Sequence, residues 1–255
     1  MTFIDQKMIY YPERTIAATP ADVGLEYEDA FLTTSDGVKI HGWWAPGGSK
    51  TTLLWFHGNG GNIGDRVENL LLLHDRLGVS VFILDYRGYG RSEGKPSEKG
   101  LYLDAEAAVE YLTREHGLSV ADDVVVFGRS LGCGVAVEVA ARHQVRAVIL
   151  ESGFPSVQAM VDRTYPFLPS SMLLSLVEAR YDSASKLPDV HAPVMVLHGD
   201  RDRTVSIAMG EELFESANEP RRFYTISGAD HNDTYHVGGE AYFEALREFL
   251  LDLGP

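Results

Sequence analysis

Cysteine is nearly absent from this sequence of 255 residues, since Cys133 is the single one and no disulfide can form within the chain. A lone thiol is typical of a reducing compartment, so we expect a cytoplasmic protein. The sequence also lacks any apolar run near the roughly 20 residues that a membrane-spanning helix needs. No charged and then apolar segment at its start indicates a signal peptide. We therefore expect no membrane span, while peripheral contact with a membrane stays open.

Positive charge is scarce as well. Lysine and arginine number 22 against 37 aspartates and glutamates, for a formal net charge of −15, and no long basic run occurs. Such a surface repels phosphate backbones, so nucleic acid is not expected as a partner. No cluster of histidine, cysteine and aspartate has the spacing of a zinc site, and His-x-x-x-His is missing. We expect neither a metal nor a cofactor.

Strand-like and helix-like segments alternate along most of the chain. The expected strands are 25–33, 38–45, 51–56, 79–85, 124–127, 147–150, 193–198 and 222–226, and the expected helices are 70–77, 101–115, 131–142, 209–217 and 241–253. This alternation predicts one α/β domain over residues 1–255, with a mostly parallel sheet and helices on both of its faces. Functional loops in such a sheet lie at the carboxyl ends of the strands.

Two segments fall outside the alternation. Residues 1–24 have mixed polarity and are expected to form an extended arm. Residues 152–190 are too many for a simple connection between two strands, and we expect a small, mostly helical cap over the catalytic edge. Its apolar residues Met160, Phe167 and Leu173 are candidates for contact with an acyl chain, although a core of the cap itself is the other interpretation.

The strongest chemical signal is the pentapeptide Gly128-Arg129-Ser130-Leu131-Gly132. It follows a β-branched and aromatic run and precedes a helix of small residues. The two glycines permit a turn too sharp for side chains, and this turn lifts the Ser130 hydroxyl clear of the strand. The sequence therefore predicts that Ser130 is a nucleophile.

A serine hydroxyl needs an imidazole to accept its proton and a carboxylate to orient that imidazole. Two strand-end loops supply them: Asp200 and Asp202 follow the strand that ends at His198, and His231 follows the strand that ends at Ile226. We expect His231 to be the base. Asp200 and Asp202 are both candidates for the acid.

Two other residues have competing interpretations at this point. Glu151 also ends a strand and is a candidate for a displaced acid. His57 precedes a glycine-rich loop, which we expect it to support structurally.

Acyl transfer also needs donors for the tetrahedral oxyanion. The backbone N–H of Leu131, which follows the nucleophile, is one candidate. The other is the N–H of Asn59 in the stretch His57-Gly58-Asn59-Gly60-Gly61-Asn62. A mobile glycine turn or a phosphate cradle is the alternative interpretation of this stretch, but the Gly-Lys-Ser/Thr ending of a cradle is missing.

Five motifs occur together in one order: His57-Gly58-Asn59-Gly60-Gly61-Asn62, Asp85-Tyr86-Arg87-Gly88-Tyr89-Gly90-Arg91-Ser92, Gly128-Arg129-Ser130-Leu131-Gly132, Gly199-Asp200-Arg201-Asp202-Arg203-Thr204-Val205 and Gly228-Ala229-Asp230-His231-Asn232-Asp233. With them the chain resembles the α/β-hydrolase fold family over nearly its whole length, and within it the small-capped serine hydrolases related to eukaryotic protein depalmitoylases. The resemblance implies a catalytic triad of Ser130, Asp202 and His231. It also implies an oxyanion hole of the Asn59 and Leu131 N–H groups, and it favours Asp202 over Asp200.

These observations together predict a cofactor-independent serine hydrolase that acts on small-molecule carboxylic esters or thioesters. A peptidase or amidase on the same scaffold is one alternative. A non-catalytic protein that keeps the fold as a ligand pocket is the other.

Overall fold

The structure is a computed structural model, and it describes residues 9–164, 167, 174–175 and 177–254. Its centre is an eight-stranded sheet in the order β10-β9-β8-β7-β4-β6-β3-β2. The strands are β2 (Glu28–Thr33), β3 (Lys39–Ala45), β4 (Thr52–Phe56), β6 (Ser80–Asp85), β7 (Val124–Arg129), β8 (Ala147–Glu151), β9 (Val194–Gly199) and β10 (Arg221–Ile226). Only β3 pairs antiparallel, with β2 and with β6. The predicted mostly parallel sheet is thus confirmed.

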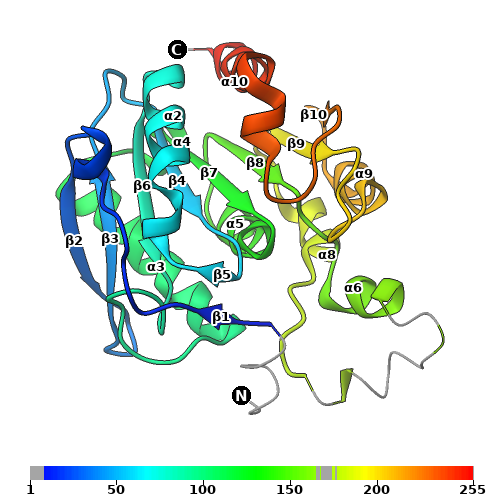
Figure 1. Cartoon of the computed structure of the whole chain (residues 1–255), viewed down its shortest axis with the longest axis horizontal. Coiled ribbons are helices and arrows are strands. Elements are labelled where there is room, and N and C mark those ends of the chain that lie inside the picture. Colours follow the sequence, from blue (N-terminus) through cyan, green and yellow to red (C-terminus); the bar gives the residue numbers. More distant parts are fainter. Residues whose placement is uncertain (1–8, 165–166, 168–173, 176, 255) are drawn as a thin grey trace.

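Helices cover both faces of this sheet (Figure 1). One face carries α2 (Val67–Leu77) and α10 (Thr234–Asp252), and the other carries α3 (Glu98–Glu115), α5 (Leu131–Arg142) and α9 (Ile207–Ser216). Successive residues of a strand point to opposite faces. Accordingly, Trp55 of β4 packs with the α2 and α10 side and Phe56 packs with the α5 side. This two-sided burial explains why the central strands are apolar throughout.

Local capping sets the helix ends. Helix α3 begins three residues before the predicted start, because the Ser97 Oγ accepts a hydrogen bond from the Gly100 N–H at 3.1 Å. Helix α2 ends where Gly78 adopts a left-handed conformation with φ of 67°. A further short helix, α4 (Val120–Asp123), leads into β7.

The amino-terminal arm is only partly extended. Its strand β1 (Tyr11–Pro12) pairs in parallel with β5 (Gly60–Gly61) of the glycine-rich loop, and a 3-10 helix, η1 (Pro20–Val23), follows. The Tyr10 hydroxyl lies 2.8 Å from the Tyr181 hydroxyl. The arm therefore joins the glycine-rich loop to the segment expected as a cap.

The segment 152–190 divides into two parts. Helix α6 (Val157–Thr164) stands away from the sheet (Figure 1). Helix α8 (Ser183–Lys186) and the 3-10 helix η3 (Leu187–Asp189) instead pack on α5, and Leu187 is buried in the main core. Within the described part of the segment predicted as a cap, α6 thus stands apart, whereas α8 and η3 pack against the main domain.

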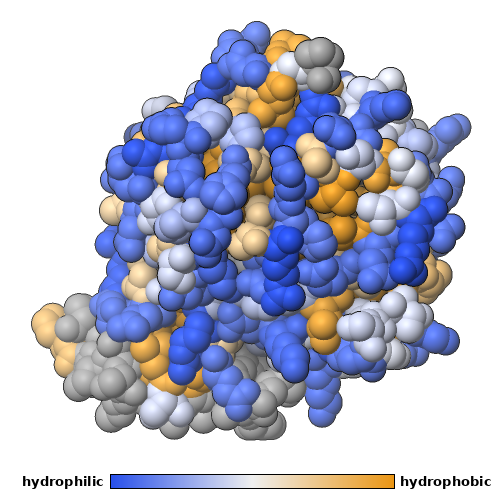
Figure 2. All heavy atoms as spheres, turned by 180° about the vertical axis from the view of Figure 1, so that it is seen from behind, coloured by the Kyte–Doolittle hydropathy of each residue, from blue (hydrophilic) through white to orange (hydrophobic). Residues whose placement is uncertain are grey.

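The face turned away in Figure 1 is mostly hydrophilic, with apolar side chains gathered in separate patches (Figure 2). This agrees with the excess of acidic residues in the sequence. Among the described residues, no helix combines the length and the apolar character needed to cross a membrane.

The close approach of helix α5 to strand β4 beside Ser130 provides a test of this architecture. A Cβ on Gly132 would lie 2.0 Å from the Phe56 carbonyl oxygen, which belongs to the β4 backbone. We expect Gly132→Ala to lower the free energy of unfolding by at least about 2 kcal/mol in urea denaturation, because helix α5 must move off the sheet. Gly48→Ala is the matched control, since a Cβ there meets only the Gly78 oxygen at 3.9 Å. Equal stability of the two variants would contradict the close approach.

Candidate active site

Ser130 lies in a strained turn between β7 and α5. Its φ of 53° and ψ of −118° belong to a region that residues with a side chain rarely adopt. The turn is held because the Ser130 N–H donates to the Glu151 carbonyl oxygen at 2.8 Å. Glycine is required at position 128, where a Cβ would lie 2.6 Å from the Cys133 Cα. The backbone thus directs the Ser130 hydroxyl out of the sheet edge.

His231 and Asp202 complete a chain of hydrogen bonds with this hydroxyl. The His231 Nε2 lies 3.0 Å from the Ser130 Oγ, and the His231 Nδ1 lies 2.7 Å from the Asp202 Oδ2. The three residues come from the loops after β7, β9 and β10, whose carboxyl ends share one edge of the sheet. The structure therefore brings together the three residues that the sequence singled out as nucleophile, base and acid.

Asp202, and not Asp200, faces the imidazole. The second oxygen of Asp202 accepts the N–H groups of Thr204 at 2.9 Å and Val205 at 2.7 Å. Burial raises the pKa of Asp202, but hydrogen bonds from His198 and His231 outweigh it and hold the pKa below its usual range. The Asp200 carboxylate accepts the Gly228 N–H at 2.7 Å instead.

His198 also contacts the acid, which the sequence did not reveal. Its Nε2 lies 2.8 Å from the Val205 carbonyl oxygen and 3.4 Å from the Asp202 Oδ2, and its side chain is fully buried. The only available signal was a histidine at the end of a buried strand, four residues before Asp202. We interpret His198 as a support for the acid loop.

The glycine-rich loop lies beside the nucleophile. A Cβ on Gly58 would be 3.5 Å from the Ser130 Cβ, and Asn59 and Leu131 line the same pocket as Ser130. The carbonyl oxygen of Asn59 accepts hydrogen bonds from the Tyr11 N–H at 3.0 Å and from the Tyr89 hydroxyl at 2.7 Å. This anchoring gives the loop a fixed conformation, as a set of preorganised donors requires.

His57 supports this loop from beneath. Its Nδ1 lies 2.7 Å from the Gly58 carbonyl oxygen. Burial, assisted by the Arg66 charge, lowers the pKa of His57 to about 3, so the imidazole is neutral. Burial also raises the pKa of the neighbouring Asp85 carboxyl to about 7, and this carboxyl accepts the Ile63 N–H at 3.0 Å.

A cavity of about 650 Å³ opens next to Ser130. Its apolar wall is formed by Ile9, Leu131, Phe154, Val157, Met160, Val161, Val177 and Val205. Met160, one of the candidates for contact with an acyl chain, lies in this wall. Phe167 is not among the described residues of this wall, and it is 96% exposed. Leu173 lies outside the described residues.

A buried ion pair joins the nucleophile to the histidine loop. Arg129 and Glu151 are register partners on β7 and β8, and the Arg129 Nε donates to the Glu151 carboxylate at 3.1 Å. The Arg129 Nη2 donates to the His231 carbonyl oxygen at 2.8 Å. Thr234 and Tyr242 donate their hydroxyls to the same Glu151 carboxylate at 2.6 and 2.5 Å.

Glu151 is therefore not a displaced catalytic acid, because its oxygens are occupied by Arg129 and by two hydroxyls while His231 pairs with Asp202. Sequence reasoning missed the role of Arg129 in this network. The signal that could have found it was a pair of opposite charges at the ends of two adjacent apolar strands.

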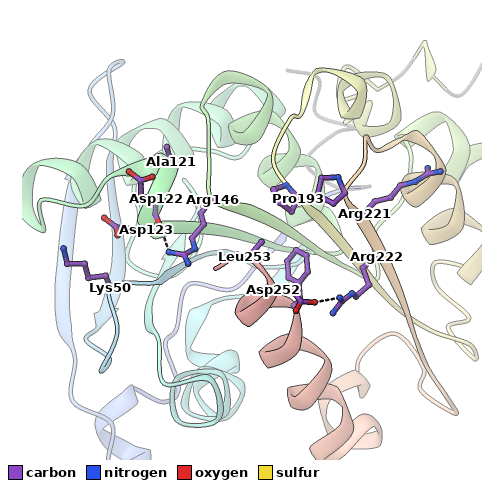
Figure 3. Close-up of a pocket in the computed structure, with 12 residues that line it drawn as sticks. Lys50, Ala121, Asp122, Asp123, Arg146, Pro193, Arg221, Arg222, Asp252 and Leu253 are labelled. Atoms are coloured by element: carbon purple, nitrogen blue, oxygen red, sulfur yellow. Dashed lines mark hydrogen bonds and ion pairs between the residues drawn. The ribbon is translucent and has the colours of Figure 1, made fainter. Parts of the chain in front are cut away.

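A second cavity, of about 700 Å³, lies at the opposite edge of the sheet (Figure 3). Its lining contains both basic and acidic residues; Arg146 donates to the Asp122 carbonyl oxygen and Arg222 forms an ion pair with Asp252. None of its described lining residues is a serine, cysteine or histidine. The described lining of this cavity thus contains no counterpart to Ser130 and His231.

Comparisons with known proteins agree with this geometry. The sequence profile of the family described as "Serine aminopeptidase, S33" matches residues 47–177. Protein bem46 of Schizosaccharomyces pombe is 34% identical over 97% of this chain and 86% of its own length. Human alpha/beta hydrolase domain-containing protein 17B is 33% identical over 79% of this chain and 67% of its own. The chain belongs to this α/β-hydrolase family, and the resemblance predicted from its motifs is confirmed.

Among solved structures, the Pyrococcus furiosus esterase Pf2001 is similar with a TM-score of 0.79. The two chains are 25% identical, and the match covers 96% of this chain and all of the esterase. The predicted α/β-hydrolase fold is therefore confirmed over nearly the whole chain.

The Arg129–Glu151 network generates a prediction on stability. We expect Glu151→Gln to lower the free energy of unfolding by about 3–5 kcal/mol, because it leaves the buried Arg129 charge without its partner. The double variant Arg129→Met with Glu151→Gln should be less destabilised than Glu151→Gln alone, since no unpaired charge remains. Urea denaturation measures both.

The exposed pair of Arg222 and Asp252 provides the control for this series. Arg222→Gln should cost no more than about 1 kcal/mol, as is usual for surface ion pairs. A Glu151→Gln variant as stable as Arg222→Gln would show that the buried pair does not hold the two loops.

Proposed function

We propose that this protein is a serine hydrolase that cleaves carboxylic esters or thioesters through an acyl-enzyme on Ser130. One observation carries the proposal: the unbroken chain of hydrogen bonds from the Ser130 hydroxyl through the His231 ring to the ionised Asp202 carboxylate. Such a chain lets a serine hydroxyl lose its proton as it attacks a carbonyl carbon. Family membership and the apolar wall of the adjoining cavity support the same proposal.

The proposed reaction has two halves. The Ser130 Oγ attacks the acyl carbon while the His231 Nε2 takes its proton, and Asp202 stabilises the imidazolium that forms. The Asn59 and Leu131 N–H groups stabilise the oxyanion, and His231 then gives the proton to the departing alcohol or thiol. Water enters, His231 activates it, and hydrolysis of the acyl-enzyme releases the acid and restores Ser130. No step in this sequence calls for a metal or a cofactor.

Peptide or amide bonds are the second candidate, because the matching family is described as a serine aminopeptidase. An aminopeptidase must hold the ammonium group of its substrate, which calls for carboxylates beside the nucleophile. Among the described lining residues Asp65 is the single acidic one, while Arg66 and Arg129 are both basic. This charge balance favours esters. Turnover of an ester and of an amide that share one acyl group discriminates the two candidates.

The proposed substrate is a small molecule whose acyl chain lies along the apolar wall. Phe154, Val157 and Met160 give this wall aliphatic and aromatic surface beside Ser130. A cytoplasmic location is part of the proposal and is motivated by the single cysteine, which is buried.

Replacement of the nucleophile is the first test. Ser130→Ala should lower the turnover of a short p-nitrophenyl ester by at least several hundredfold, because no other group can form the acyl-enzyme. A fluorophosphonate probe should label the wild type and not this variant. Ser227→Ala, which changes an exposed serine of the loop before His231, is the control and should retain both properties. Unchanged turnover in Ser130→Ala would reject the proposal, and an unlabelled wild type would favour a non-catalytic pocket.

The two neighbouring aspartates give a sharper test. Asp202→Asn should lower kcat by about 10⁴-fold, since the amide no longer favours the imidazole tautomer that can accept the serine proton. Asp200→Asn should leave kcat little changed, because an amide oxygen can still accept the Gly228 N–H. Steady-state kinetics on one ester compares them. If the two variants lost activity equally, the assignment of the acid would be wrong.

A further inference from the structure

The cavity beside Ser130 contains an arginine whose charge has no counter-ion among the described residues. Arg66 lines this cavity and donates from its Nη2 to the Gly60 carbonyl oxygen at 2.7 Å. Its Nε is buried and has no hydrogen-bond partner in the described part of the chain. The enclosed Nε cannot itself meet a ligand in the cavity, but other atoms of the Arg66 side chain line it, and an anionic oxygen is the partner that a guanidinium binds most strongly.

The neighbouring charges do not neutralise Arg66. Arg129 is already paired with Glu151 and adds a second positive charge nearby. The Asp65 carboxylate caps the adjacent turn by accepting the Asn62 N–H at 2.9 Å, and it makes no ion pair with Arg66. Burial and then the Arg129 charge lower the pKa of Arg66, while Asp65 and Asp85 act on it electrostatically in the opposite direction without forming an ion pair with it.

Arg66 lies on the side of the cavity that the glycine-rich loop forms, where it donates to the Gly60 carbonyl oxygen. The groups that act electrostatically on it include Arg129, which holds the His231 carbonyl oxygen, and Tyr235, which follows the His231 loop. The apolar wall comes from other elements, chiefly α6 and Phe154, and Figure 1 shows α6 well apart from β5, which leads to Arg66. In the proposed reaction the leaving group departs from the histidine end, because His231 gives it a proton.

We infer that Arg66 forms an anion-binding subsite for a carboxylate or phosphate carried by the alcohol or thiol part of the substrate. The inference deepens the proposed function and rests on it. The acyl chain then contacts the apolar wall, while the leaving group presents its negative charge to the guanidinium. Because the protein has a net charge of −15, it repels anions in general, so a preference for a charged leaving group must come from a local site.

The test compares two chromogenic esters with the same octanoyl chain. In one the leaving group is a neutral nitrophenol, and in the other the same ring carries a carboxylate. Arg66→Gln should lower the ratio of kcat/KM for the charged ester to that for the neutral ester by about tenfold or more, chiefly through KM of the charged ester. Arg66→Lys should retain more of the ratio than Arg66→Gln. Arg114→Gln, on the exposed end of α3, is the control and should leave the ratio unchanged.

Two further arms locate the charge and guard against misfolding of a variant. The third substrate is an ester of the neutral nitrophenol whose acyl chain ends in a carboxylate. Its kcat/KM should be the same in the wild type and in Arg66→Gln. If that ester alone depends on Arg66, the assignment to the leaving group is overturned. In the wild type, the free carboxylated nitrophenol should inhibit hydrolysis of the neutral octanoyl ester more strongly than the neutral nitrophenol does, and equal inhibition by the two overturns the subsite without any variant.

The outcomes also separate this inference from the proposed function. Hydrolysis of both octanoyl esters with a ratio that Arg66→Gln does not change would reject the subsite and keep the hydrolase. Failure of the wild type to hydrolyse either ester would reject both.

Discussion

The buried contact between Arg129 and Glu151 ties the parts of the candidate site together. Arg129 precedes the nucleophile, Glu151 ends the neighbouring strand, and the guanidinium reaches on to the carbonyl oxygen of His231. Burying two charges costs free energy unless each of them has several hydrogen-bond partners. Here two hydroxyls donate to the Glu151 carboxylate in addition to Arg129. The contact thus fixes the distance between a hydroxyl and an imidazole that come from positions 101 residues apart.

A second constraint is steric. The turn at Ser130 can lie against the sheet only because residues 128 and 132 have no side chain, whereas a Cβ on Gly58 of the glycine-rich loop would make only an ordinary contact with the Ser130 Cβ at 3.5 Å. The positive φ of Ser130 costs free energy that the surrounding packing must offset. The strain at Ser130 and the close backbone approach at its neighbouring glycines arise from the same tight turn. A relaxed turn would move the Ser130 hydroxyl away from His231.

Much of this arrangement could be predicted from the sequence because function in a parallel sheet collects at strand ends. Ser130 and Asp202 follow strands whose apolar runs are plain in the sequence, and His231 follows the more polar strand β10, so their common edge follows from topology. The choice between Asp200 and Asp202 required the loop conformation or a family motif. The Arg129–Glu151 pair required the register of β7 on β8, and the path of the arm across Gly60 and Gly61 required tertiary pairing. Spacing along a chain contains neither kind of information. Phe167 was misjudged because apolar character alone does not say which side of a loop a residue occupies.

The cavity is lined partly by loops at the ends of the strands and partly by the segment 152–190, and its polarity differs between these two parts. Most of the lining residues contributed by α6 and by Phe154 are apolar, because that segment stands away from the sheet and must bury some surface against its own elements. The strand-end loops contribute Leu131 and Val205 to the apolar wall, but they also contribute Ser130 and His231, whose hydrogen bonds to each other and to Asp202 require polar side chains there. A substrate that spans the cavity therefore meets hydrocarbon at one end and charged donors at the other. Discrimination between substrates then depends on both ends. An apolar wall discriminates only weakly between acyl chains of similar size, whereas a buried charged donor strongly disfavours a ligand that leaves it without a partner.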